Sequence, residues 1–543
     1  MVKKLSLTKK NVAIIIIIIS VISLGLKLYT IDFSVSPVED TYGYVLRALA
    51  HNSGDFSEHP RKTLGWSIAI SPFYNLFDSD SFLDYVNTAR SLSIVISLIS
   101  IPAMYILARK FFDQKYSLCA ASFLAFEPHL NYNSGHGLSE PLYILIFIIS
   151  FYFILNKNSN YSYLSFLSVA LLWWVRWSGV VMLIVISIIF FWKNKRNKTN
   201  LAKYFACIGI FLLISSPMLL QRNDDFGDPL FFSQSTALFT GDYGAVLAEN
   251  TVNLEYGPFD YIEEHGISEF LYNFLLLGIS NLITVIFKMS FPFLIIFLPF
   301  GILFSFRAFD QEKKSVRSIW ILLLITLSSF ILYFAVIPEK RLIYHIFPFI
   351  IILCVIPLQR VVKYGLTTFW FSKKQKNYFL VGIMAVIIIL SFTYTTRYDT
   401  IDPVLDYERI EYGKYLNNNL DGKILDAGYT LQGLKYAKLD NSSGAFKNYK
   451  TNMGVDALTD NKLHEVVIYG KTLDDFLINA QEYDLKYLSI NSNSVFETWY
   501  PYFENIYHNE DDYPFLIKVY DTKDMKFEKF HVKTFEIDYG KIP

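Results

Sequence analysis

Hydrophobic positions along the chain gather in long blocks that are separated by polar segments. The first block, 11–29, contains a run of isoleucines long enough to cross the ~30 Å hydrocarbon core of a bilayer. Similar blocks lie at 91–108, 116–130, 141–155, 161–177, 179–192, 201–220, 287–306, 319–337, 342–357 and 378–394. The pattern predicts an α-helical polytopic membrane protein with about 11 transmembrane helices.

The polar segments predict how these helices cross the membrane. Four lysines precede the first block, and no small-residue cleavage site follows it, so we expect a retained helix with a cytoplasmic N-terminus. Lys and Arg recur in every second loop, which places those loops on the same side. The long loops 30–90 and 221–286 are then external. Apolar stretches within them, 66–77 and 270–286, are expected to be helices at the membrane interface.

Composition supports a membrane protein and excludes some functions. The chain is 53% hydrophobic and 18% charged, which is less charge than soluble proteins carry. The formal net charge is +0, so no basic field favours nucleic acid. Cys119, Cys207 and Cys354 fall inside apolar blocks, without disulfide or metal-ligand spacing.

A boundary near Arg397 divides the chain into a transmembrane catalytic domain, 1–396, and an extracytoplasmic α/β domain, 397–543. In the second domain the pattern predicts helices at 405–419, 473–481 and 495–507, and strands at 423–426, 464–469, 485–490 and 515–520. Its turns carry no glycine-rich phosphate-binding motif, so we assign it no chemistry.

Candidate chemistry gathers in the first external loop, at 36–65. In one interpretation Ser36 caps a helix, Pro37 occupies its first turn and Glu39 closes a capping box. A helical projection adds a second interpretation that is compatible with the first. Apolar residues form one stripe, and the opposite face carries Glu39, Asp40 and Arg47. A carboxylate beside a cation on an exposed face is suited to act as a base next to a phosphate anchor.

The order of motifs in this loop resembles the GT-C superfamily of membrane glycosyltransferases. It is most similar to the protein O-mannosyltransferase and aminoarabinose-transferase type, whose pattern resembles Asp-Glu-x-x-Tyr, then Gly-Asp, then a proline-rich segment. The chain has Glu39-Asp40-Thr41-Tyr42, then Gly54-Asp55, then Glu58-His59-Pro60. The order of the acids and the spacing of the tyrosine differ from that pattern, so either carboxylate could be the base.

Four later segments fit the same resemblance. They are Glu140 at the head of an apolar block, Arg176 among tryptophans, Gln221-Arg222-Asn223, and Pro338-Glu339-Lys340-Arg341. Glu140 could instead be a helix-start charge, and Arg176 an interfacial anchor. Lys340 and Arg341 lie in an expected external loop against the charge rule, which favours binding of an anionic headgroup.

The resemblance implies a glycosyltransferase that moves a sugar from a dolichyl- or undecaprenyl-phosphate donor to an acceptor hydroxyl on a protein, glycan or lipid. A mannosyltransferase acting in protein glycosylation would be typical. Asp40 or Glu39 is then the catalytic base. The expected substrate-binding residues are Arg47, His59, Arg61, Lys62, Glu140, Arg176, Arg222, Lys340 and Arg341.

No metal site is predicted, although paired carboxylates could bind a divalent cation, Mg²⁺ or Mn²⁺. Two other functions stay open at this point. A transporter or flippase for lipid-linked sugars would need ionisable residues deep inside the spans, and the charges lie mainly at their ends. A non-catalytic membrane anchor would not need so many spans.

Overall fold

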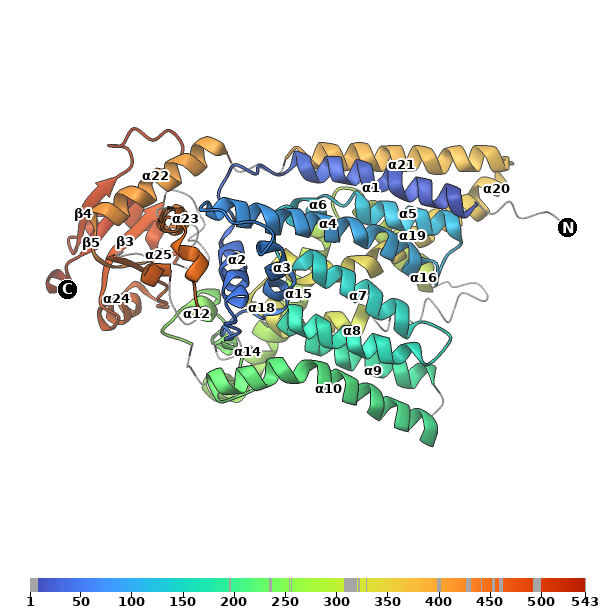
Figure 1. The fold of residues 1–543 in the computed structure, drawn as a ribbon, viewed down its shortest axis with the longest axis horizontal. Helices are drawn as coiled ribbons and strands as arrows, with labels where there is room; N and C mark the ends of the chain where they lie inside the picture. Colours follow the sequence, from blue (N-terminus) through green and yellow to red (C-terminus); the bar gives the residue numbers. More distant parts are fainter. Residues whose placement is uncertain are drawn as a thin grey trace.

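The structure is a computed structural model of the chain. It describes residues 8–542 except 195–196, 234–236, 253, 255, 307–319, 321–322, 329, 398–401, 426–430, 441, 452–454, 459–461 and 492–499. Long helices lie side by side in a bundle, and a smaller domain with a sheet stands at one end of it (Figure 1). The N-terminus lies at the opposite end of the bundle.

Six helical segments of the described chain are long and apolar enough to cross a membrane. They are α1 (Lys9–Tyr29), α4 (Phe82–Ala108), α10 (Lys198–Phe226), the segment Ile267–Met289, the segment Lys340–Thr368 that contains α19 (Phe347–Arg360), and α21 (Lys373–Thr395). Shorter apolar helices are α7 (Glu140–Ile154), α8 (Tyr161–Val175), Trp177–Lys193, which contains η1 (Trp177–Val180) and α9 (Val181–Lys193), and α16 (Leu294–Phe306). The protein is therefore a multi-pass membrane protein, and the count of about eleven spans stays a prediction.

Two apolar blocks and one apolar loop stretch fold differently from the expectation. The two blocks are interrupted near prolines, Pro128 and Pro292. Block 116–130 divides into α5 (Gln114–Ala125) and α6 (Pro128–Ser134). Block 287–306 divides between α15 (Leu277–Met289) and α16, with Pro292 in the gap. Proline disfavours the helical conformation of the residue before it and lacks an N–H, so each helix stops short of it. Segment 270–286, expected at the interface, belongs to a helical segment long enough to span.

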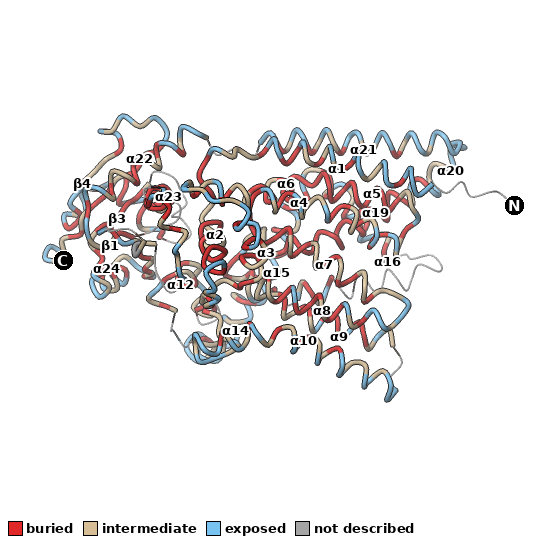
Figure 2. The backbone as a smooth tube through the Cα atoms, viewed as in Figure 1, coloured by how far each residue is buried: buried red, intermediate tan, exposed pale blue. Residues whose placement is uncertain are grey.

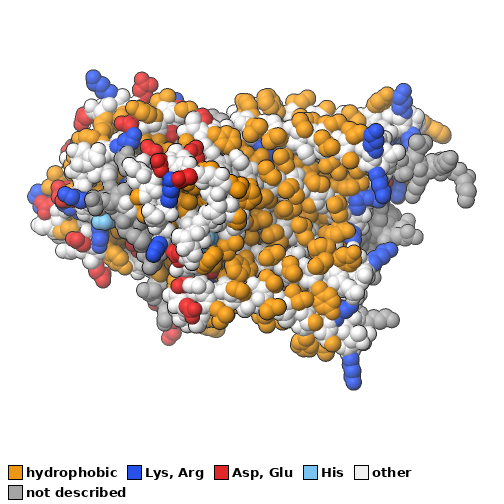
Figure 3. Space-filling view, viewed as in Figure 1, with side chains coloured by type: hydrophobic (Ala, Val, Ile, Leu, Met, Phe, Trp, Pro, Cys, Tyr) orange, Lys and Arg blue, Asp and Glu red, His pale blue; other side chains and the backbone are white. Residues whose placement is uncertain are grey.

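The surface of the bundle matches a membrane environment. Apolar side chains cover its flank, while Lys and Arg gather at the end remote from the sheet domain (Figure 3). The outer helices α1, α10 and α21 expose much of their length, whereas α19 is buried at the centre (Figure 2). Burying a polar backbone inside helices while exposing apolar side chains is what a lipid solvent requires.

The C-terminal domain contains one five-stranded sheet in the order β2-β1-β3-β5-β4. Strands β1 (Gly422–Leu425), β2 (Leu463–Val466) and β3 (Leu485–Asn491) are parallel, and β5 (Val532–Ile537) pairs antiparallel with both β3 and β4 (Leu516–Asp521). Its helices include α22 (Pro403–Asn419), α23 (Gln432–Asp440), α24 (Leu473–Glu482) and α25 (Tyr502–His508). The predicted α/β alternation is present. Helix α23 and strand β5 were not predicted, and 426 and 495–499 fall outside the described residues.

The sheet domain and the loop 30–90 share a hydrophobic core. The loop forms α2 (Glu39–Asn52) and α3 (Gly65–Tyr74). Tyr42 of α2 stacks on Phe82 with ring centroids 5.8 Å apart, and Phe82 meets Phe446 of the C-terminal domain edge-on at 5.4 Å. The C-terminal domain is thereby fixed against the loop in which the sequence places the chemistry. Within α3, Trp66 and Ile70 are buried while Phe73 is 40% exposed, so one face of this helix packs on the protein and its end reaches the surface.

Candidate active site

Helix α2 begins at Glu39, but Ser36 does not cap it. The cap position is Val38, which makes no side-chain hydrogen bond. Ser36 instead donates its backbone N–H to Asp406 Oδ2 at 2.8 Å and its hydroxyl to Asp406 Oδ1. The predicted capping box is therefore wrong, because a carboxylate of α22 competes for the serine. Glu39 and Asp40 remain in the first turn, where the helix dipole stabilises negative charge.

The predicted faces of α2 are only partly observed. Tyr42, Val45 and Leu49 are buried, as the apolar stripe predicts. Arg47 was expected beside Asp40 on an exposed face, and this is wrong. Its side chain is buried and donates to the carbonyl oxygens of Gly43 at 3.4 Å and Lys62 at 3.3 Å. Arg47 therefore supports the turn that carries Lys62.

Asp40 lies between two cations from distant parts of the chain. Lys62 Nζ is 3.0 Å from Asp40 Oδ1, and the Arg341 guanidinium pairs with Asp40 Oδ2. Arg341 also pairs through Nε with Glu339 Oε2 at 2.5 Å. The side chains of Asp40, Lys62 and Arg341 are 28%, 22% and 34% exposed, so the cluster can be reached from solvent.

Gly43 permits the approach of Lys62 to the helix. A Cβ at position 43 would lie 2.8 Å from Lys62 Nζ, closer than carbon atoms of this kind are found. Any larger residue would push the amine outward. The glycine therefore explains how Lys62, which belongs to the loop after α2, can lie across the first turns of that helix.

The charges around Asp40 keep it ionised. Burial raises the pKa of the Asp40 carboxyl, but Lys62 and Arg341 outweigh this effect and hold the pKa well below its usual range. Burial lowers the pKa of Lys62, and the charge of Asp40 opposes that shift. Asp40 is accordingly a carboxylate that accepts a proton poorly while both cations remain on it.

Glu39, the neighbouring carboxylate, faces the C-terminal domain. It pairs with Lys435 of α23, and Lys435 also lies 3.8 Å from Glu465 Oε2. In the same helix, Gln432 Nε2 donates to the carbonyl oxygen of Pro37 at 2.5 Å. The two adjacent acids thus contact different parts of the molecule, and α23 holds the start of α2.

The turn that carries Lys62 is anchored to the segment 221–286. The backbone N–H of Arg61 donates to His59 Nδ1 at 3.1 Å, and Arg61 Nη2 donates to the carbonyl oxygen of Ala248 at 2.9 Å. Burial and the surrounding cations lower the pKa of His59 well below its usual value, so the imidazole is neutral. The contacts of His59 and Arg61 position the turn, and their expected roles in substrate binding stay predictions.

Glu58 and Arg222 form a second acid–arginine pair that is closed to solvent. Arg222 Nη1 lies 2.8 Å from Glu58 Oε2, and both side chains are 0% exposed. Arg222 also donates to the carbonyl oxygen of Phe231 at 2.8 Å and lies 4.9 Å over the Trp177 ring. Burial raises the pKa of Glu58 to about 7, and Arg222 opposes that shift. In this arrangement Arg222 supports the wall of the site.

The remaining predicted residues lie around Tyr44. Its hydroxyl is 3.3 Å from Ser139 Oγ, next to Glu140, and Lys62 Nζ lies 5.2 Å from its ring centroid. Glu140 pairs with Arg176 at 2.8 Å. Tyr44 interacts electrostatically with Asp40, Arg176 and Glu140, so this pair adjoins the Asp40 cluster. Lys340 precedes Arg341 and is exposed.

In the part of the chain that the structure describes, histidine, cysteine and acidic residues form no group of three or more that could hold a metal ion. Glu39 and Asp40 each contact a basic side chain instead. The expectation that the protein has no metal site stays a prediction.

Comparison with known proteins places this geometry in context. The sequence profile of the family described as dolichyl-phosphate-mannose-protein mannosyltransferase matches residues 64–220. The oligosaccharyltransferase of Archaeoglobus fulgidus, in its apo form, is similar in structure with a TM-score of 0.57 at 12% identity, over 89% of this chain and 70% of that chain. The chain has the GT-C fold.

Two further structures extend the comparison of the GT-C fold. The archaeal oligosaccharyltransferase AglB from Archaeoglobus fulgidus, in complex with an inhibitory peptide and a dolichol-phosphate, gives a TM-score of 0.54 at 12% identity, over 98% of this chain and 75% of that chain. ArnT from Cupriavidus metallidurans bound to undecaprenyl phosphate gives a TM-score of 0.46 at 11% identity, over 96% of this chain and 97% of that chain. A search of the curated proteins finds no match.

Sequence reasoning missed three residues at the site of this GT-C fold. Glu339 pairs with Arg341, Tyr243 donates its hydroxyl to Glu339, and Lys435 pairs with Glu39. Glu339 stands two positions before Arg341 in the motif already selected, so its proximity was a usable signal. Tyr243 and Lys435 come from distant segments, and no local pattern marks them.

Proposed function

We propose that the chain is a membrane glycosyltransferase that transfers a sugar from a polyprenyl-phosphate donor to an acceptor hydroxyl on the external face. The observation that carries this proposal is the Asp40 carboxylate held between Lys62 and Arg341, in reach of solvent. The cluster lies where the apolar bundle meets the C-terminal domain, so a lipid-borne phosphate could reach it from the membrane. The GT-C fold and the match to a mannosyltransferase profile support this assignment.

In the proposed reaction, Asp40 takes the proton of the acceptor hydroxyl as its oxygen attacks the anomeric carbon of the donor. The bond between that carbon and the phosphate oxygen breaks, and the phosphate leaves with the electron pair. Lys62 and Arg341 bind the departing phosphate and stabilise its growing negative charge. The planar guanidinium of Arg341 can donate two parallel hydrogen bonds to phosphate, whereas Lys62 supplies a point charge.

Donor binding would also activate the base. Without a donor, both cations neutralise Asp40 and keep it weakly basic. A phosphate that draws the cations toward itself leaves the burial of Asp40 less compensated, and burial raises the pKa of a carboxyl. Asp40 thereby becomes a better proton acceptor when the donor is in place.

The distribution of charge supports the proposed orientation. Lys and Arg gather at the end of the bundle remote from the C-terminal domain, and by the positive-inside rule this end faces the cytoplasm. The C-terminal domain, Glu39 and Asp40 are then external, where a lipid carrier can present a sugar without nucleotide chemistry. A donor sugar of the hexose or mannose type is the one that the matched profile favours.

Complementation of cells that lack the protein tests the proposal. Mass spectrometry of polyprenyl-phosphate sugars and of total glycans should show an accumulated donor and a missing product, and the wild-type chain should restore both. Asp40→Asn should accumulate in the membrane at wild-type levels and restore neither. Asp224→Asn, which alters an exposed acid on α10, is the matched control and should complement fully. Full complementation by the double variant Glu39→Gln/Asp40→Asn would refute the proposal.

A further inference from the structure

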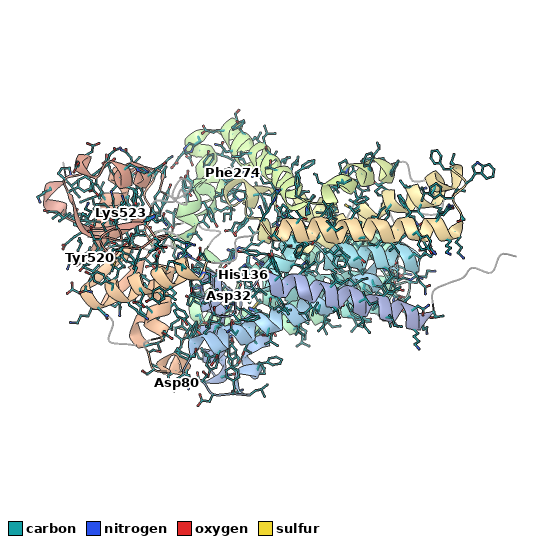
Figure 4. All side chains as sticks on the ribbon, turned by 90° about the horizontal axis from the view of Figure 1, so that it is seen from above. Asp32, Asp80, His136, Phe274, Tyr520 and Lys523 are labelled. Carbon is teal, nitrogen blue, oxygen red and sulfur yellow. The ribbon has the colours of Figure 1, made fainter. Side chains whose placement is uncertain are left out.

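A second polar cavity lies beside the Asp40 cluster. Its volume is about 470 Å³, within the range of ligand-binding pockets. The second external loop supplies most of its lining, including Asp242, Tyr261, Glu264 and Asn273. Figure 4 labels Phe274, another lining residue, on the helical segment that stands between the C-terminal domain and the long helices.

The cavity shares a wall with the candidate active site. Ala335 and Val336 line it, just before Glu339, which pairs with Arg341. Asp242 lines it as well, and the next residue, Tyr243, donates its hydroxyl to Glu339. The pair formed by Tyr243 and Glu339 therefore stands between this cavity and the cations that hold Asp40.

The C-terminal domain closes the other side. Tyr469 and Asp242 both line the cavity, and burial and the charge of Asp242 raise the pKa of the Tyr469 hydroxyl. The backbone of Tyr469 forms a reciprocal pair with the side chain of Asn250, at 3.0 Å in each direction. Glu249 N–H donates to the carbonyl oxygen of Val467 at 2.8 Å. These bonds fix the wall before any ligand arrives.

Its lining combines aromatic faces with hydrogen-bonding groups. Tyr261 stacks on His265 with centroids 4.4 Å apart, and its hydroxyl accepts from Asn273 Nδ2 at 2.8 Å. Tyr256 donates its hydroxyl to Glu264 Oε2 at 2.6 Å. Carboxylate and amide groups can bind hydroxyls, while tyrosine rings offer apolar faces with polar edges.

The charge of the cavity is opposite to that of the donor site. Its lining includes three acidic side chains, Asp242, Glu264 and Glu269, against the basic side chain of Lys471. An anionic ligand would meet repulsion here, whereas Lys62 and Arg341 attract a phosphate on the other side of Glu339. The two sites therefore select ligands of different charge.

Resting on the proposed function, we infer that this cavity binds the acceptor, and that the acceptor is a neutral, polyhydroxylated glycan. Its hydroxyls would bond to Glu264 and Asn273, and its ring faces would lie on Tyr256 and Tyr469, the lining tyrosines that are only partly buried. The acceptor hydroxyl would reach Asp40 past Tyr243 and Glu339. An acidic glycan is excluded by the carboxylates of the lining.

Direct binding to the purified full-length chain tests this inference without a donor or turnover. The probes are arrays of neutral oligosaccharides, of acidic oligosaccharides and of peptides. Neutral oligosaccharides should bind, and Glu264→Gln should weaken that binding about fivefold or more, because it removes a charge-assisted hydrogen bond. Glu264 is exposed, so the variant should fold. Glu263→Gln, its exposed neighbour outside the cavity, is the matched control and should bind like the wild type.

Binding of peptides or acidic glycans alone, or equal affinity in the two glutamine variants, would overturn the inference. Absence of transfer by the wild type in every assay, together with glycan binding that Glu264→Gln weakens, would count against the proposed function and leave the cavity as a glycan-binding site without an acceptor role.

Discussion

Two acid–arginine pairs involve the loop 30–90. Each joins a carboxylate of this loop to an arginine from a later motif, but the two pairs differ in their surroundings. Asp40 and Arg341 are 28% and 34% exposed, and Lys62 shares the carboxylate. Glu58 and Arg222 are both 0% exposed, and aromatic rings cover the arginine. The first pair can exchange its partners for a ligand, whereas the second cannot open without exposing two buried charges.

The difference shows that burial decides whether an acid–arginine pair can open to bind a ligand. A buried ion pair costs much to desolvate, and removal of one partner leaves an uncompensated charge. A partly exposed pair is weakly held and suited to binding an anion reversibly. Arg341 is therefore suited to catalysis and Arg222 to the architecture of the site, although both were selected as phosphate ligands from the same kind of motif.

The largest expected effect comes from breaking the closed pair. Arg222→Met should destabilise the protein by about 3–5 kcal/mol, because Glu58 is left buried and unpaired. Thermal unfolding of the detergent-purified protein measures the loss. The double variant Glu58→Met/Arg222→Met should recover most of the stability, since it removes both charges. A single variant with wild-type stability and a selective loss of transfer would show that Arg222 is itself a substrate ligand.

Breaking the open pair should leave the fold intact and reduce transfer. Arg341→Met should lower the rate about 10²–10³-fold, the cost of removing one donor that stabilises a developing negative charge. Thermal unfolding should change little, because the side chain is partly exposed. Arg341→Lys keeps the charge without the planar guanidinium and should recover part of the rate. Equal losses of stability in Arg341→Met and Arg222→Met would erase the distinction between the pairs.

Gly43→Ala tests the position of Lys62 without altering any charge. The new Cβ would displace the amine, which approaches to 2.8 Å, so transfer should fall about tenfold if one hydrogen bond is lost. Stability should hold or rise, because alanine favours a helix over glycine by about 1 kcal/mol. Lys62→Met should produce a similar loss, and the combination should add little. Full activity in Gly43→Ala would show that Lys62 does not act from this position.

The smallest expected effect is a difference between the two pairs in how the stability of the protein depends on pH. Glu58 has a folded pKa of about 7, above its ordinary value of 4.5, so its contribution is fullest below pH 4.5. That contribution is lost as the pH rises through 7. The melting temperature should therefore fall across this window, as the pH rises from 4.5 to 7. Glu58→Gln should flatten the slope, whereas Asp40→Asn should not, because the pKa of Asp40 lies well below the window.

The sequence predicted the membrane bundle because apolar blocks report directly on a lipid environment. It also placed Asp40, Lys62 and Arg341 among the residues of interest, through motifs in external loops. Whether Arg47 contacts Asp40 could not be predicted, because a helical projection ignores the packing of neighbouring segments. The capping box failed for the same reason, since Asp406 lies far along the chain from Ser36.

The role of the C-terminal domain was also beyond local patterns. Its sequence carries no glycine-rich phosphate-binding motif, and the structure reveals contacts that no motif marks. Lys435 pairs with Glu39, and Gln432 bonds to Pro37, so the domain acts by holding α2. Contacts of this kind depend on the tertiary arrangement of α23, a helix that the periodicity did not reveal.

In the proposed mechanism Asp40 is the base, and Lys62 and Arg341 bind the donor phosphate. Equilibrium binding of undecaprenyl phosphate and sugar transfer, measured on the same purified variants, tests it most directly. Asp40→Asn should bind the lipid phosphate at least as tightly as the wild type, because a competing carboxylate is gone, while transfer falls about 10²–10⁴-fold. Lys62→Met/Arg341→Met should lose the binding itself. Wild-type transfer by Asp40→Asn, or undiminished lipid binding by the double variant, would contradict the account.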